Sequence, residues 1–262
     1  MLVPRAVCVL TVMTGVVLVS AAWGADTALV VDRGLPQANI NNVAGAARSN
    51  VRWHNDEQGF LGDDFTIGNR GEKWVIDSIR TWTVPGLHEL DPDHLGDFFQ
   101  DVRLYVGTSG AGLTPRGAAA LSQGTDETGD ANIRVSDATA AGAPLYDDFG
   151  KALRVWQIDF TGLHIVVDGG IRYGFGVWGM GRPIPGADSK TYQWFNHASN
   201  ASLSGARQDG ADGAMLLFDA SGKAEGSFDG QGNGWDKSSD INVQVFAHRV
   251  DGHTAKAELA RE

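Results

Sequence analysis

Residues 156–178 read WQIDFTGLHIVVDGGIRYGFGVW, three apolar runs of which the first and last alternate with polar or small residues. A period of two places the apolar side chains on one face of a β-strand. The Asp168-Gly169-Gly170 step between the last two runs favours a tight turn, because Asp-Gly and Gly-Gly accept positive φ angles. The stretch therefore predicts antiparallel strands, the last two joined as a hairpin.

The same alternation recurs along the chain, whereas no stretch after residue 24 keeps a helical period until the last dozen residues. Further strands are expected at 63–67, 73–83, 99–107, 191–196, 214–218 and 241–245. A βαβ architecture would need crossover helices, for which the sequence has no pattern. The sequence predicts an all-β fold, an antiparallel β-sandwich of the jelly-roll kind with about nine strands. Long Gly- and Asp-rich loops are expected at 85–96, 108–130, 179–190 and 221–239.

The N-terminus has the three parts of a secretory signal peptide. Arg5 supplies the positive charge, residues 7–19 are apolar, and small residues precede Ala25. The sequence therefore predicts a signal peptide at 1–24, a single sandwich domain at 25–250 and a polar tail at 251–262. An exported protein, secreted or periplasmic, without membrane insertion after cleavage, is expected.

Composition excludes two classes of protein. Asp and Glu exceed Lys and Arg by 32 to 21, giving a net charge of −11, so a nucleic-acid partner is not expected. Cys8 is the single cysteine and lies in the predicted signal peptide, which excludes a disulfide framework. Stability must then come from core burial, with bound metal as an additional contribution.

Two motifs resemble a known family. Residues 62–67, GDDFTI, are followed by 74–79, WVIDSI, and this pair resembles the opening of secreted bacterial sandwich domains called choice-of-anchor domains. The resemblance implies a β-sandwich and export, and it carries over no catalytic residues. Many members end in a Pro-Glu-Pro sorting signal, and this chain departs from them with a polar end.

Carboxylate placement gives little support for an enzyme. A glycosidase needs two carboxyl groups about 5–9 Å apart. Asp63 and Asp64 are adjacent, so a strand would direct them to opposite faces, while Glu72, Asp77 and Asp159 are single acids. The sequence has no Gly-x-Ser-x-Gly nucleophile motif.

A calcium site is predicted in the loop near residue 230. Asp229, Gln231 and Asn233 follow the alternating oxygen-ligand rhythm of a calcium loop, and Asp240 falls at the position of its closing acid. Lys237 interrupts this pattern, and the alternative is a glycine-rich connection between strands. A structural calcium ion is the cofactor that this site would hold.

A ligand site is predicted around Trp194. Tyr192 and Trp194 would share one face of a strand, with Asn196 and Asp188 nearby as hydrogen-bonding groups. Rings beside polar groups are what a sugar site requires. The alternative is that both rings fill the core of a large sandwich.

Three functions remain open from the sequence. The first is a secreted, non-catalytic module that binds glycan or another extracellular surface polymer. The second is a polysaccharide hydrolase whose carboxylates come from separate strands. The third is a structural protein of the envelope or matrix without a small ligand.

Overall fold

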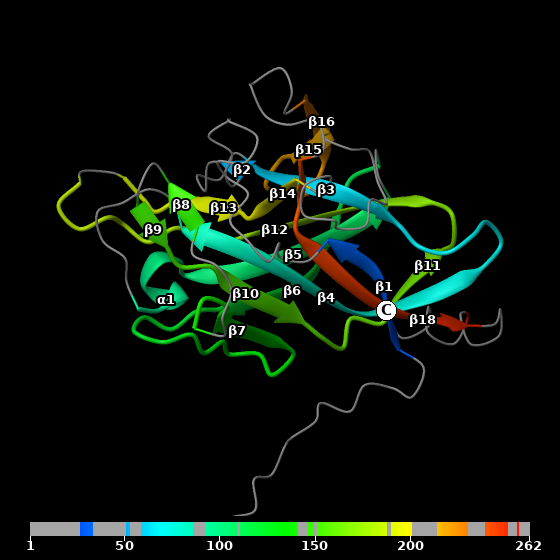
Figure 1. Cartoon of the computed structure of the whole chain (residues 1–262), viewed down its shortest axis with the longest axis horizontal. Helices are drawn as coiled ribbons and strands as arrows, with labels where there is room; N and C mark the ends of the chain where they lie inside the picture. Colours follow the sequence, from blue (N-terminus) through cyan, green and yellow to red (C-terminus); the bar gives the residue numbers. More distant parts are fainter. Residues whose placement is uncertain are drawn as a thin grey trace, which may run out of the picture.

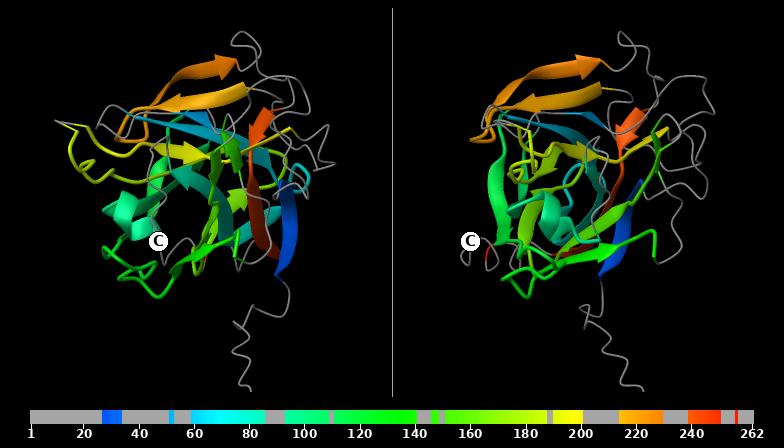
Figure 2. Two further views of the ribbon diagram at one scale, coloured as in Figure 1. Left: turned by 60° about the vertical axis from the view of Figure 1, so that its left-hand side comes forward. Right: turned by 90° about the vertical axis from the view of Figure 1, so that its left-hand side faces the viewer.

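The computed structural model describes residues 27–33, 51–52, 59–85, 93–108, 111–140, 146–148, 151–187, 190–200, 214–229, 239–250 and 256. Two antiparallel sheets pack against each other (Figure 1, Figure 2), so the all-β sandwich that the alternation predicts is confirmed. The described ranges contain no helix of the length and apolar character needed to cross a membrane.

Sheet A is built around the long strand β4. Its main order is β1 (Ala28–Arg33), β18 (Val243–Val250), β4 (Lys73–Pro85), β10 (Trp156–Phe160) and β7 (Ile133–Asp137). Two shorter strands also pair with β4: β11 (Ile165–Asp168) and β13 (Trp194–Asn196). A third short strand, β2 (Val51–Arg52), pairs with β13 and extends the sheet beyond it.

Sheet B has six strands and covers the inner face of sheet A. Its order is β16 (Ala224–Asp229), β15 (Ala214–Phe218), β3 (Phe60–Thr66), β12 (Arg172–Trp178), β5 (Asp101–Thr108) and β6 (Thr114–Ala120). Two small pairs and one helical turn complete the described elements: β14 (Ala198–Asn200) with β17 (Ser239–Ile241), β8 (Tyr146–Asp148) with β9 (Lys151–Leu153), and α1 (Leu95–Phe98).

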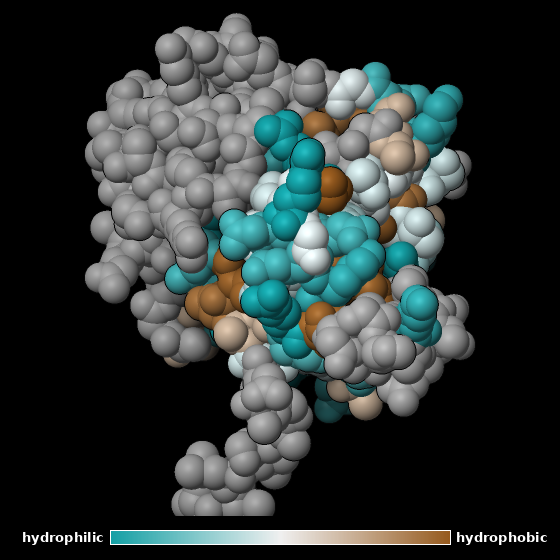
Figure 3. All heavy atoms as spheres, turned by 90° about the vertical axis from the view of Figure 1, so that its right-hand side faces the viewer, coloured by the Kyte–Doolittle hydropathy of each residue, from teal (hydrophilic) through white to brown (hydrophobic). Residues whose placement is uncertain are grey.

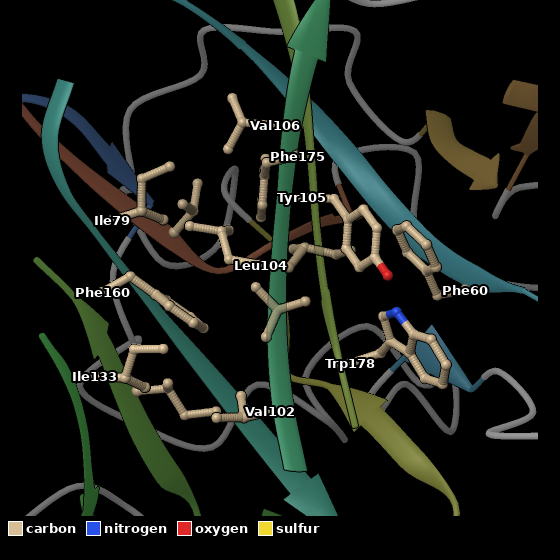
Figure 4. Packing of buried hydrophobic residues seen from close by; sticks show 14 of the residues in the cluster. Phe60, Ile79, Val102, Leu104, Tyr105, Val106, Ile133, Phe160, Phe175 and Trp178 are labelled. Atoms are coloured by element: carbon tan, nitrogen blue, oxygen red, sulfur yellow. The ribbon is translucent and has the colours of Figure 1, made fainter. Parts of the chain in front are cut away.

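The core lies between the sheets and follows from the alternation. In β10, Trp156, Ile158 and Phe160 are fully buried while the two residues between them face outward. Figure 4 shows Phe160 from sheet A beside Leu104 from β5 of sheet B. Burial of each large apolar side chain stabilises the fold by about 1.5–3 kcal/mol, so this layer replaces the missing disulfides.

A second layer of rings covers the outer face of sheet B. Phe60 packs against Tyr105 and Trp178 with ring centroids 4.8 and 5.9 Å apart (Figure 4). The ring of Phe218 lies 5.4 Å from that of Phe60. A Cβ atom on Gly176 would lie 2.3 Å from Phe60, so glycine at this position lets the ring lie against the strand. The alternating glycines of the quoted stretch are therefore packing positions.

The predicted hairpin at Asp168-Gly169-Gly170 is wrong, although the tight turn is present. Gly170 has the expected positive φ of 71°, but β11 pairs with β4 in sheet A and β12 pairs with β3 in sheet B. The turn therefore carries the chain from one sheet to the other. It lies beside the β3–β4 turn, which crosses between the sheets as well, and the amide of Gly170 donates to the carbonyl of Ile67 at 2.9 Å.

These two crossing turns lie at the right-hand end of the molecule in Figure 1, and the described residues in the middle of that side are mostly hydrophilic (Figure 3). Lys73 pairs there with Asp168, and Arg249 pairs with Glu72 at 3.3 Å. Such exposed pairs contribute about 0–1 kcal/mol each, so the turns are held chiefly by their backbone bonds.

Two of the predicted loops contain strands. β6 lies inside the expected loop 108–130, and β16 lies inside the expected loop 221–239. The sequence of β6, TPRGAAA, has little intrinsic preference for a strand, and its pairing with β5 supplies the hydrogen bonds that define it. β1 and β7 are further strands that the sequence did not predict, although their Val and Ile residues favour a strand. With these and the short strands, the described strands exceed the nine expected.

Candidate functional site

The predicted ring platform lies inside the sandwich. Tyr192 is 3% exposed and Trp194 is 2% exposed. Trp194 lies 4.8 Å from the ring of Phe99, and Tyr192 meets the ring of Phe98 edge-on at 5.0 Å. Burial raises the pKa of the Tyr192 hydroxyl. A sugar can stack only on an exposed ring face, and neither ring presents one in this conformation.

Asn196 is also buried inside the sandwich, where both ends of its amide group make hydrogen bonds. It is 4% exposed, its Oδ1 accepts a hydrogen bond from Trp194 Nε1 at 3.0 Å, and its Nδ2 donates to the carbonyl of Leu61 at 3.1 Å. The structure thus brings Tyr192, Trp194 and Asn196 together as predicted, but as buried packing and hydrogen-bonding groups. Asp188, the fourth predicted ligand residue, lies outside the described residues.

The predicted calcium loop is described only at its two ends. Asp229 is the last residue of β16 and Asp240 lies in β17, and their side chains are outside the description, as are Gln231 and Asn233 altogether. Among the described residues, no group of three or more His, Cys, Asp or Glu side chains could hold a metal ion. Calcium at 229–240 stays a prediction.

The adjacent acids of the family-like motif form a buried ionic cluster. Asp63 is fully buried, and its Oδ2 lies 3.2 Å from Arg33 Nη1 and accepts from the amide of Ile241 at 2.7 Å. Arg33, also fully buried, donates to the carbonyl of Asp64 as well. Because β1 belongs to sheet A and β3 to sheet B, this ion pair joins the two sheets.

Other acids considered for catalysis are engaged in hydrogen bonds. Asp77 Oδ2 lies 2.7 Å from His248 Nδ1 and accepts from the Thr27 hydroxyl at 2.7 Å. The hydroxyl therefore faces the carboxylate and not the imidazole, which is the wrong order for a nucleophile and its base. Glu72 accepts from the amide of Asn69, and this bond lowers its pKa, whereas a general acid needs a raised one.

A polar row crosses the outer face of sheet A, and it is the candidate functional site. Asp32, Gln244, Arg80, Asp159 and Arg134 are register partners on β1, β18, β4, β10 and β7. Register partners in antiparallel strands point to the same face. The row thus follows the five strands that lie side by side in Figure 1, and at about 4.8 Å per strand it spans roughly 19 Å.

Hydrogen bonds connect most of the polar row. Gln244 Nε2 donates to Asp32 Oδ1 at 2.9 Å, and Arg80 Nη1 lies 3.5 Å from Gln244 Oε1. Arg80 Nε donates to Asp159 Oδ1 at 2.5 Å, and Gln157 donates to the other carboxylate oxygen at 2.9 Å. Arg134 and Asp32, at the two ends, are exposed. The row therefore presents donors and acceptors of both charges along the outer face of sheet A, exposed at its two ends and half-buried in its middle.

An apolar pair adjoins the polar row. Leu29 on β1 is 41% exposed and is the register partner of Phe246 on β18. The guanidinium of Arg80 lies 5.8 Å from the centre of the Phe246 ring. A ring beside a charged row is a partly apolar surface with polar groups next to it, the combination that the sequence predicts around Trp194.

The sequence contains the residues of the polar row but not their order. Arg80, Asp159 and Gln244 lie at outward positions of strands that the alternation predicts. Their alignment depends on β1, β18, β4 and β10 being neighbours, and these strands are far apart in the chain.

A buried histidine, His197, lies between β13 and β14, beside the end of β17. Burial lowers the pKa of His197 from 6.5 to about 4. Its Nδ1 lies 2.7 Å from Asn242 Nδ2, and an amide donor at this nitrogen requires the imidazole to be unprotonated there. His197 is therefore neutral in the folded protein near pH 7.

Stability is expected to fall by about 2 kcal/mol between pH 7 and pH 5 through His197. Its folded pKa of about 4 lies below the ordinary 6.5, so the unfolded chain takes up the proton first as the pH falls through this window. Urea unfolding of the wild type and of His197→Gln at both pH values measures the difference. The variant should lose this part of the pH dependence, and His248→Gln is the control. An unchanged pH dependence in His197→Gln would contradict the assignment.

Comparison with known proteins adds no relative. No family model matches the chain, and neither a curated protein nor a solved structure matches it.

Proposed function

We propose that this chain is an exported, non-catalytic β-sandwich module that binds a polar extracellular polymer, most simply a glycan, across the outer face of sheet A. The observation that carries the proposal is the polar row, in which five strands align Asp32, Gln244, Arg80, Asp159 and Arg134. An extended polymer that crosses the strands would meet a new donor or acceptor about every 4.8 Å.

Several features of the acids support a role without catalysis. Asp63 neutralises a buried arginine, Asp77 binds His248 and Thr27, and Asp159 binds Arg80. A hydrolase acid must be free to give up its proton to the substrate and needs a raised pKa. Carboxylates engaged by cations and hydrogen-bond donors of the protein itself are suited to positioning and binding.

Binding is expected to weaken about tenfold in Arg134→Gln, because each lost hydrogen bond to a charged group costs about 1.5 kcal/mol. Arg134 lies at the exposed end of the polar row, so the fold should not change. The measurement is a glycan-array screen with and without calcium, followed by titration of the best ligand. Lys223→Gln, at the exposed β15–β16 turn of sheet B, removes the same charge and is the matched control.

Two results would contradict the proposal. Equal loss of affinity in Lys223→Gln would show that net charge and not the polar row decides binding. Release of reducing sugar ends from the bound polymer, measured in the same preparation, would assign the chain to the hydrolases instead.

A further inference from the structure

The first strand of sheet A has the features of a separable docking strand. Among the described strands, β1 pairs with β18 alone and forms one edge of the sheet. Its buried side chains are Val31 and Arg33, both fully buried, while Leu29 and Asp32 on the same strand are exposed. Val31 and Arg33 thus supply the fully buried contacts of β1, and the half-buried Val30 packs against the core beside them.

Arg33 makes the recognition specific. A strand placed beside β18 in another register would leave the carboxylate of Asp63 without its guanidinium, because Nη1 reaches it at 3.2 Å across the sandwich. Shifting a strand by one residue would also turn Val31 and Arg33 to the outside. The site beside β18 therefore accepts an extended segment with the pattern Val-x-Arg.

The connection after β1 would let the strand reach a neighbour. Residues 34–50 separate the end of β1 from β2. A segment of that length spans at most about 60 Å when extended, which exceeds the size of a small domain. With the predicted mature end at Ala25, β1 would be tethered on one side only.

We infer that β1 docks in trans, so that the β1 strand of one copy of this chain occupies the site beside β18 in a second copy. Strand exchange of this kind repeats every contact of the single chain and changes only the connection, which makes it a low-cost route to self-association. An edge strand is also the element that an incoming strand can replace without breaking the interior of the sheet. The inference is independent of polymer binding by the polar row.

Cysteine cross-linking between two differently substituted chains tests this inference. Cys8 is the single cysteine of the sequence, so Cys8→Ser chains carry thiols only where they are introduced. Asp32 and Gln244 are register partners, and Cα atoms of such partners are close enough for a disulfide. A chain with Asp32→Cys is mixed with a chain with Gln244→Cys, warmed, cooled and oxidised. Exchange is expected to give at least ten times more disulfide-linked heterodimer than Asp32→Cys mixed with Ser136→Cys on β7.

Variants of the donor strand test what is recognised. Arg33→Ala in the Asp32→Cys chain should lower the heterodimer yield at least tenfold, whereas Leu29→Ala should leave it unchanged. The acceptor chain keeps its own Arg33, so it folds in both mixtures. A chain that carries both Asp32→Cys and Gln244→Cys shows whether the register is correct within one molecule.

The inference is overturned if the doubly substituted chain closes its internal disulfide while the mixture gives no more heterodimer than the β7 control. It is also overturned if neither disulfide forms, because β1 then does not lie in this register. A heterodimer that forms equally well with Arg33→Ala would remove Arg33 as the recognition residue.

Discussion

Arg33→Met is expected to lower the free energy of unfolding by about 3–5 kcal/mol, the usual cost of removing one partner of a buried ion pair. Methionine fills much of the same space, so the loss comes mainly from the carboxylate of Asp63, which stays fully buried without a guanidinium. Urea unfolding followed by tryptophan fluorescence at pH 7 measures the change. The effect is large for a domain whose total stability is about 5–15 kcal/mol.

A second substitution separates the charge from the packing. The two oxygens of Asp63 accept from the backbone amides of Ile241 and Asp64, each at 2.7 Å. In Arg33→Met with Asp63→Asn, the buried side chain is neutral and its carbonyl oxygen still accepts one of these two bonds. This double variant should therefore recover part of the loss. A loss below about 1 kcal/mol in Arg33→Met, or no recovery in the double variant, would contradict the role of the pair in joining the sheets.

The buried ion pair also gives a physical reason for the adjacent acids of the GDDF segment. Asp63 points between the sheets to Arg33, while Asp64 points to the other face of β3, where its Oδ2 lies 3.5 Å from Arg172 Nε. The sequence predicts the opposite directions from strand geometry. It does not predict that both acids are buried, because the partner Arg33 lies on β1, a strand that the alternation did not identify.

The sequence predicts strands in which buried apolar residues alternate with polar ones. It does not predict strands that are defined only by hydrogen bonds to a neighbouring strand. In β10 the change of polarity at every residue reveals the strand and its inner face within five residues. In β6, with the sequence TPRGAAA, no apolar residues alternate with polar ones, and only pairing with β5 defines the element. The Asp168-Gly169-Gly170 turn shows the same limit, because local φ preferences fix a turn but not the sheets that it joins.

The candidate site was harder to predict than the fold, because alternation gives two faces without telling which one is covered. Polar neighbours made Trp194 look like a surface ring, yet its indole N–H is satisfied by Asn196 inside the core. The polar row on sheet A depends on the order β1-β18-β4-β10-β7, which is set by long-range pairing.

Trp194→Ala is expected to lower the free energy of unfolding by about 3–5 kcal/mol, because a buried ring is replaced by a cavity. The ring packs on Phe99 at 4.8 Å, and its loss also removes the donor to Asn196. The midpoint of thermal unfolding should fall by roughly 6–20 °C for a domain of this size. Differential scanning calorimetry measures the shift, and Leu29→Ala, which truncates an exposed side chain, is the control.

Trp194→Phe distinguishes a core ring from a ligand platform more sharply than the alanine variant. Phenylalanine keeps most of the apolar volume but cannot donate to Asn196, so the expected loss is about 1–3 kcal/mol, the cost of leaving a buried acceptor unpaired. A stacking platform would show the reverse pattern, because an exposed phenyl ring still stacks on a sugar and the fold would not change. An unchanged melting temperature in both variants, with glycan affinity lost in the alanine variant alone, would show instead that Trp194 belongs to the binding surface. Because the ring is 2% exposed, we expect the melting temperature to respond instead.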